Sequence, residues 1–211
     1  YTGMQSEVDS IKKLKDPKSE VSCHYLINRK GKIIQMVKDN NIAWHAGRSR
    51  WKKFVNLNKS SLGIELVNKG HNHGYQNFSG KQIKSLICLC KKLKKKYSIK
   101  KENFLGHSDI APLRKNDPGE KFPWRKLSTY SLGKWYKKSG QRSFNAKIGK
   151  KQIEILFFKN IQKLGYRYFS ITKRNFKDKK IIKSFQQHYL PSNVSGKIDK
   201  KTYEISQFLA Y

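Results

Sequence analysis

Short apolar runs separated by turn residues dominate the first third of the chain. Residues 22–28 and 32–37 are two such runs, and the tripeptide Arg-Lys-Gly between them is typical of a turn. The pattern predicts a β-hairpin. A third run, residues 62–67, is apolar except for Glu65. This pattern predicts a buried strand, and because burying a charge is costly, its one carboxylate should have a partner or a function.

A helical spacing follows these strands. Ser79 is a good helix cap, and after it apolar residues recur every three or four positions, at Ile83, Leu86, Ile87, Cys90, Leu93 and Tyr97. Residues 103–106 then predict one more short strand. Because strands alternate with helix, the pattern favours an α/β fold.

The composition changes after Trp135, where a polar stretch with glycine and serine is typical of a linker. Beyond it the spacing predicts helices over residues 150–164, 174–189 and 200–210. We therefore predict two domains, residues 1–138 with the α/β pattern and residues 148–211 with three helices.

The charge is strongly positive, with 47 Lys and Arg against 14 Asp and Glu and a formal net charge of +33. Only eight of the basic residues are arginine, the side chain suited to base recognition, so we expect no nucleic-acid partner. A nucleic-acid-binding protein stays the alternative that the charge alone supports. The positive charge could also attract the protein to a different anionic polymer, such as a cell wall rich in carboxylates.

One polar loop, residues 106–119, combines residue types that are common in catalytic sites. His107 follows the predicted strand, Asp117 lies ten residues later before a Pro-Gly turn, and Lys115 lies two residues before Asp117. An imidazole and a carboxylate are suitable ligands for a catalytic Zn²⁺, a lysine could stabilise an oxyanion, and Glu65 could serve as general base. An ordinary turn aspartate, a surface histidine and a buried ion pair of Glu65 explain the same residues without a metal.

Four motifs together resemble the zinc-dependent N-acetylmuramoyl-L-alanine amidases. They are Trp44-His45-Ala46-Gly47, the segment 61–66, the loop 106–119 and Phe122-Pro123-Trp124. The resemblance implies a mixed central β-sheet flanked by helices, a Zn²⁺ cofactor, and a peptidoglycan or muropeptide substrate cut between N-acetylmuramic or 1,6-anhydro-muramic acid and L-alanine. Residues 148–211 resemble, more loosely, a three-helix peptidoglycan-binding domain.

The resemblance also implies roles for single residues. His107 and Asp117 match zinc ligands, Glu65 matches the acid that activates water, and Lys115 matches the lysine that stabilises the tetrahedral intermediate. Residues that match or border the substrate cleft are His24, Trp44, His45, Ala46 and Arg48. Arg48 could contact the carboxylates of a peptide stem, and a solvated loop explains it equally well.

One departure from the family pattern concerns the first zinc ligand. The family has a histidine just before the position of Tyr1, so we expect that ligand immediately upstream of this sequence. We also expect a monomer in the periplasm, with a possible lipid anchor to the outer membrane through upstream residues. The alternative that the missing ligand supports is a non-catalytic peptidoglycan-binding protein with the amidase fold.

Overall fold

The computed structural model describes residues 1–136 and 149–211. The chain divides into two compact units: a first unit of Tyr1–Ser49 with Val55–Lys100, and a second unit of Arg50–Phe54 with Lys101–Tyr211. The predicted domains 1–138 and 148–211 stay predictions, and the stretch that would join them lies outside the described residues. No helix in the described part of the chain has the length and apolar character needed to cross a membrane.

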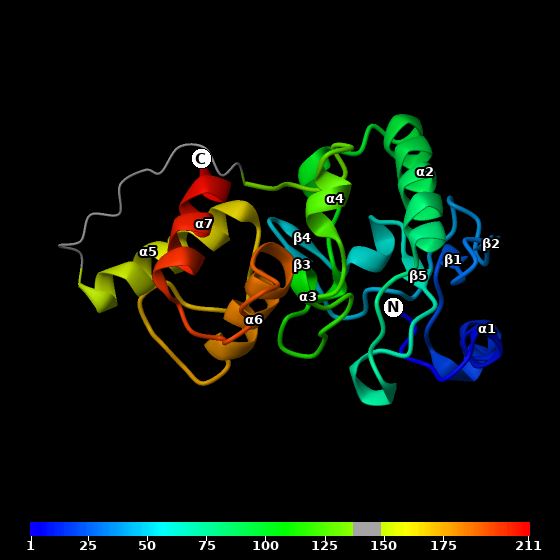
Figure 1. Ribbon diagram of the computed structural model, residues 1–211, viewed down its shortest axis with the longest axis horizontal. Helices are drawn as coiled ribbons and strands as arrows, with labels where there is room; N and C mark the ends of the chain where they lie inside the picture. The colour runs from blue at the N-terminus through cyan, green and yellow to red at the C-terminus, as the bar shows by residue number, and fades with distance from the viewer. Residues whose placement is uncertain (137–148) are drawn as a thin grey trace. The chain divides into compact units, whose positions relative to one another are not determined.

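The first unit contains a three-stranded mixed sheet in the order β2-β1-β5 (Figure 1). Strand β1 (Tyr25–Ile27) pairs antiparallel with β2 (Ile33–Gln35) and parallel with β5 (Ile64–Leu66), with Leu26 opposite both Ile34 and Glu65. The predicted hairpin and the strand around Glu65 are therefore confirmed. The mixed sheet flanked by helices also confirms the predicted fold class.

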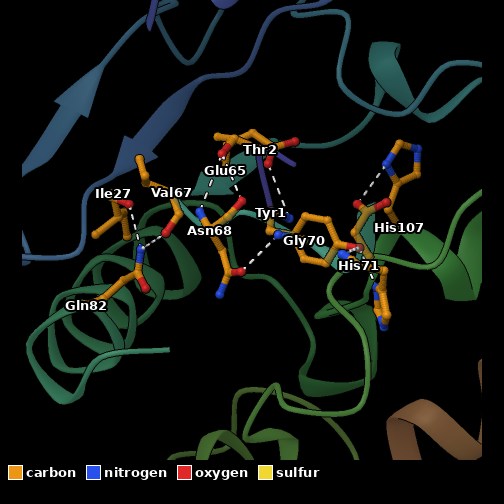
Figure 2. Close-up of polar contacts among 11 residues, drawn as sticks. Tyr1, Thr2, Ile27, Glu65, Val67, Asn68, Gly70, His71, Gln82 and His107 are labelled. Carbon is orange, nitrogen blue, oxygen red and sulfur yellow. Dashed lines mark hydrogen bonds and ion pairs between the residues drawn. The ribbon is translucent and has the colours of Figure 1, made fainter. Parts of the chain in front are cut away.

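Helix α2 (Gly80–Lys96) covers this sheet and begins where its cap predicted. The Ser79 hydroxyl accepts a hydrogen bond from the Gln82 main-chain nitrogen at 3.1 Å. The buried Gln82 side chain donates from Nε2 to the carbonyl oxygens of Ile27 and Val67, at 2.9 and 3.2 Å (Figure 2). The amide thus satisfies carbonyls at the ends of two parallel strands and ties the helix to the sheet.

The remaining elements are short in the first two thirds of the chain and longer at its end. The α-helices are α1 (Glu7–Lys15), α3 (His107–Ile110), α4 (Trp124–Ser128), α5 (Lys150–Leu164), α6 (Asp178–Tyr189) and α7 (Lys200–Ala210). Strands β3 (Arg50–Trp51) and β4 (Phe54–Val55) form a separate two-stranded sheet. One-turn 3₁₀ segments lie at Pro17–Ser19, Leu57–Lys59, His71–His73 and Lys101–Asn103.

Two expectations about local structure are corrected. Residues 103–106 form no strand; Lys101–Asn103 is a 3₁₀ turn, and the Gly106 nitrogen donates to the Asp109 carboxylate at 2.7 Å instead of to a neighbouring strand. The helix expected from residue 174 begins at Asp178, whose carboxylate accepts a hydrogen bond from the Asn175 nitrogen at 3.1 Å. At residues 103–106 a local carboxylate takes a main-chain donor that a strand would have used, whereas the Asp178 carboxylate satisfies a main-chain donor just before the observed helix start.

The three C-terminal helices belong to the second unit together with the loop 106–119. Helices α5 and α7 pack together, and Phe157, Phe158, Ile161 and Phe185 are buried. Helix α6 packs against both α3 and α4. The predicted helical bundle therefore shares a compact unit with the loop that carries the candidate chemistry.

The carboxylate of Asp39 joins β1 to the end of α2 in the first unit. It accepts hydrogen bonds from the Tyr25 hydroxyl, from the Tyr97 hydroxyl at 2.8 Å and from Lys96 Nζ at 2.9 Å. Burial acts to raise the pKa of Asp39, but these hydrogen bonds outweigh burial and lower the pKa to about 2.

Replacing Asp39 by Asn should therefore change the acid stability of the protein. A folded-state pKa of about 2 lies below the unfolded value of about 3.9, so the carboxylate stabilises the fold above about pH 4 and loses this effect as pH falls through 2. We expect Asp39→Asn to lower the free energy of unfolding by roughly 1 to 2 kcal/mol at pH 6, and by much less near pH 2. Urea titrations of both proteins at the two pH values measure this difference; an equal difference at both would contradict it.

Candidate active site

His107 and Asp117 form a close pair at the two ends of one loop in the second unit. His107 Nδ1 lies 3.2 Å from Asp117 Oδ2, and each side chain is largely buried. The Ser108 main-chain nitrogen donates to the Asp117 carbonyl oxygen at 2.8 Å. This main-chain bond holds the ends of the loop together, so the ten-residue spacing seen in the sequence becomes a contact.

Arg114 indicates which nitrogen of His107 carries the proton. Its Nη2 lies 3.4 Å from His107 Nε2, and a guanidinium can only donate, so Nε2 accepts and Nδ1 donates to Asp117. The side chain of His107 is thus oriented by hydrogen bonds on both of its ring nitrogens.

Asp117 is ionised at neutral pH. Burial alone would raise the pKa of its carboxyl group, but nearby positive charge and the hydrogen bond from His107 outweigh burial, so the pKa lies below its usual range, and Lys115 makes the smallest contribution. Lys115 is half-buried, and its main-chain nitrogen donates to the Ala111 carbonyl oxygen at 3.1 Å. The loop therefore presents an imidazole, a carboxylate and an ammonium group close together in the sequence.

The pair fits part of a zinc site. Imidazole nitrogen and carboxylate oxygen are both suitable zinc donors, and a catalytic zinc takes three protein ligands. Within the described residues, no group of three or more His, Cys, Asp or Glu side chains could hold a metal ion. His107 and Asp117 can thus supply two donors, and the third ligand expected upstream of Tyr1 stays a prediction.

Glu65 lies on β5 in the first unit, and its side chain is 20% exposed. Its Oε2 atom is 3.3 Å from the main-chain nitrogen of Tyr1 and, among the described residues, accepts no hydrogen bond. Thr2 and Gly3 donate from their main-chain nitrogens to the carbonyls of Leu66 and Asn68, both at 3.0 Å. The residues next to Tyr1 therefore run beside β5, which brings the start of the sequence to the predicted general base.

The segment 44–48 of the first unit has a mixed exposure. Trp44 is 53% exposed and Arg48 is also exposed, whereas His45 is half-buried and Ala46 is fully buried. A Cβ atom at Gly63 would overlap the His45 ring, so only glycine permits this approach of the segment to β5. Trp44 and Arg48 are thus accessible to a substrate, whereas Ala46 is fully buried and its main-chain nitrogen donates to Asn58 Oδ1 at 2.7 Å.

His24 is buried, with 1% exposure, although the sequence suggested a place near the substrate. Its Nδ1 accepts a hydrogen bond from the Gly63 nitrogen and its Nε2 lies beside the Asn41 carbonyl oxygen, both at 3.0 Å. Both ring nitrogens are therefore engaged with the main chain. The geometry gives His24 a structural role, because it joins β1 to the loops on either side of it.

Comparison with known proteins places the chain in a family. Residues 1–120 match the model of the N-acetylmuramoyl-L-alanine amidase family. The chain is 35% identical to N-acetylmuramoyl-L-alanine amidase AmiD of Escherichia coli K12 over 205 residues, which are 90% of this chain and 74% of AmiD. This chain belongs to the N-acetylmuramoyl-L-alanine amidase family.

Other relatives and solved structures agree with this amidase assignment. The 1,6-anhydro-N-acetylmuramyl-L-alanine amidase AmpD of Haemophilus influenzae is 43% identical over 107 residues, half of this chain and 56% of AmpD. The structure of Escherichia coli AmiD in complex with anhydro-N-acetylmuramic acid-L-Ala-D-gamma-Glu-L-Lys has a TM-score of 0.84 at 31% identity and covers 99% of this chain and 85% of AmiD. Pseudomonas aeruginosa AmpDh3 has a TM-score of 0.88 at 28% identity, covering 99% and 88%.

Asp109 is a residue of this amidase that the sequence patterns did not single out. It is 1% exposed and lies two residues after His107, where its carboxylate accepts hydrogen bonds from three groups of the second unit. One local signal was present, since an aspartate three residues after Gly106 is a typical partner for the main-chain nitrogen at a helix start. The two more distant partners had no signal in the local sequence.

Proposed function

We propose that this amidase hydrolyses the amide bond between the lactyl group of N-acetylmuramic acid, or of its 1,6-anhydro form, and L-alanine of the stem peptide. The observation that carries the proposal is the pairing of His107 with an ionised Asp117 in a chain of this family. The names of AmpD and of the ligand in the AmiD complex support a muropeptide as substrate.

We infer that Zn²⁺ is the cofactor, with His107 and Asp117 as ligands and a histidine upstream of Tyr1 as the third. Bound zinc supplies a Lewis acid that polarises the lactyl carbonyl and lowers the pKa of water. Asp117 contributes a charged oxygen donor, and its contact with His107 holds the imidazole beside that donor.

The reaction joins a water oxygen to the lactyl carbonyl carbon and breaks the carbon–nitrogen bond to L-alanine. Glu65 accepts a proton from the attacking water and passes it to the leaving amine. The Lys115 ammonium stabilises the negative charge that develops on the carbonyl oxygen. Trp44, His45 and Arg48 contact the muropeptide, and Arg48 suits the carboxylates of its peptide stem.

The proposal also includes the surroundings of the enzyme. The predicted peptidoglycan-binding module of residues 148–211 and the similarity to AmiD favour a periplasmic location, and we propose a lipid anchor to the outer membrane upstream of Tyr1. The net charge of +33 would concentrate the enzyme near carboxylate-rich wall material. We expect a monomer with no nucleic-acid partner.

A muropeptide digest tests the activity directly. A chain that includes the residues upstream of Tyr1 should convert anhydro-N-acetylmuramyl tripeptide to the free sugar acid and a peptide with a free L-alanine amine, which mass spectrometry distinguishes. A chelator should stop the reaction, and added Zn²⁺ should restore it. Tight binding of the muropeptide without cleavage would instead support the alternative of a non-catalytic binding protein.

A further inference from the structure

The carboxylate of Asp109 is buried within the second unit, two positions after the predicted zinc ligand His107. Asp109 Oδ2 accepts hydrogen bonds from the Gly106 nitrogen at 2.7 Å and from His188 Nδ1 at 2.8 Å, and Oδ1 accepts one from the Tyr166 hydroxyl. Asp109 and His188 are 1% and 2% exposed, and Tyr166 is fully buried. A carboxylate so far from solvent is stable only when its oxygens are hydrogen-bonded, so both of its side-chain donors matter.

Both of these side-chain donors come from the C-terminal part of the chain. His188 lies in α6 and Tyr166 follows the end of α5, 79 and 57 positions after Asp109. Burial and the nearby Asp109 raise the pKa of Tyr166 well above its ordinary value, so its hydroxyl keeps the proton that it donates.

Helix α6 makes further polar contacts with the loop that carries the predicted ligands. The Ser184 hydroxyl donates to the Ser108 carbonyl oxygen at 2.8 Å, and Lys180 Nζ donates to the Leu113 carbonyl oxygen at 3.0 Å. Ser108 in turn donates its main-chain nitrogen to Asp117. Helix α6 therefore holds the loop at main-chain positions next to His107 and between His107 and Asp117.

The ring of His188 is held in one orientation by aromatic neighbours. It stacks on Trp124 and on Tyr189, with ring centroids 4.0 Å apart in each case and interplanar angles of 12° and 14°. Among the described residues, its Nε2 has no hydrogen-bond partner. The polar contribution of His188 is thus the single hydrogen bond from Nδ1 to Asp109.

We propose that His188 and Tyr166 are positioning residues of the amidase reaction, acting through Asp109 to fix the first turn of α3 and so the direction of the His107 imidazole. The C-terminal helices are then a structural part of the metal site, in addition to any attachment to the cell wall. This inference rests on the proposed function, because it assigns His107 a metal.

Variants of His188 separate this role from simple packing. His188→Leu keeps an apolar side chain between the aromatic rings but removes the donor to Asp109. His188→Asn keeps a donor, since its amide nitrogen occupies about the place of Nδ1. Asn160→Ala is the matched control, because the buried Asn160 donates to the Ser206 hydroxyl at 3.1 Å, a contact between α5 and α7 that does not involve the loop.

The main measurement is Zn²⁺ affinity, by competition with a chromophoric chelator, on a chain that includes the residues upstream of Tyr1. Residues that orient metal ligands typically change affinity by about 10- to 100-fold when replaced, and we expect about tenfold weaker binding for His188→Leu. His188→Asn should recover most of the affinity, and Asn160→Ala should match the unmodified protein even where its melting temperature falls. The visible spectrum of bound Co²⁺ should change for His188→Leu but not for these two variants.

Kinetics and a second variant complete the test. His188→Leu should lower kcat about tenfold with little change in KM, because the substrate contacts are elsewhere. Tyr166→Phe removes only a hydroxyl and should show the same effects, more weakly, if His188→Leu fails to fold. Unchanged Zn²⁺ affinity and Co²⁺ spectrum in both folded variants would overturn the inference. An unmodified protein that binds no Zn²⁺ would instead overturn the proposed function.

Discussion

Replacing Glu65 by Gln should abolish most muropeptide hydrolysis and leave the zinc content unchanged. The glutamine side chain has nearly the shape of the glutamate but cannot accept a proton from water, and loss of a general base typically lowers the rate by about 10²- to 10⁴-fold. Because Glu65 is not among the predicted ligands, metal binding should not depend on it. Initial rates of muropeptide cleavage and elemental analysis of the same samples measure the two effects.

Glu7→Gln is a suitable control for this variant. Glu7 belongs to the same unit and accepts a hydrogen bond from Asn28 Nδ2 at 3.0 Å, so its replacement also removes one carboxylate with a neighbouring partner. Its rate should equal that of the unmodified protein. Full activity of Glu65→Gln, or equal losses in both variants, would remove Glu65 from the proposed mechanism.

Replacing Asp117 by Ala should remove zinc and activity together. The carboxylate is ionised and lies 3.2 Å from His107 Nδ1, so its loss removes the charged donor of the predicted pair. We expect substoichiometric zinc after dialysis and a rate lower by about 10²-fold or more, with part of the activity restored at high Zn²⁺ concentration. Elemental analysis and rates measured across a Zn²⁺ titration give both values.

Asp199→Asn controls for a general loss of acidic side chains. Asp199 caps α7 by accepting a hydrogen bond from the Thr202 nitrogen at 2.7 Å, and asparagine caps helices about as well. Its zinc content and rate should therefore stay unchanged. Stoichiometric zinc in Asp117→Ala would show that this carboxylate is not a ligand.

Local patterns in the sequence predicted the elements around the site well. The hairpin, the strand around Glu65 and helix α2 follow directly from apolar spacing and a serine cap. The strand expected at residues 103–106 was wrong, because the Asp109 carboxylate takes a main-chain donor there. Apolar spacing does not reveal such a competitor, since it describes burial and not the destination of each hydrogen bond.

The order of amino acids was enough to specify the chemical groups of this protein: a carboxylate inside an apolar strand, and an imidazole, an ammonium and a second carboxylate on one short loop. Local spacing encodes such features because residues close in the chain stay close after folding. Contacts between distant segments determined the surroundings of these and other polar side chains. They buried His24, whose ring is hydrogen-bonded to the main chain, and they brought His188 into a hydrogen bond with Asp109, 79 positions earlier in the sequence. Those pairings depend on how whole elements pack, which no local pattern specifies.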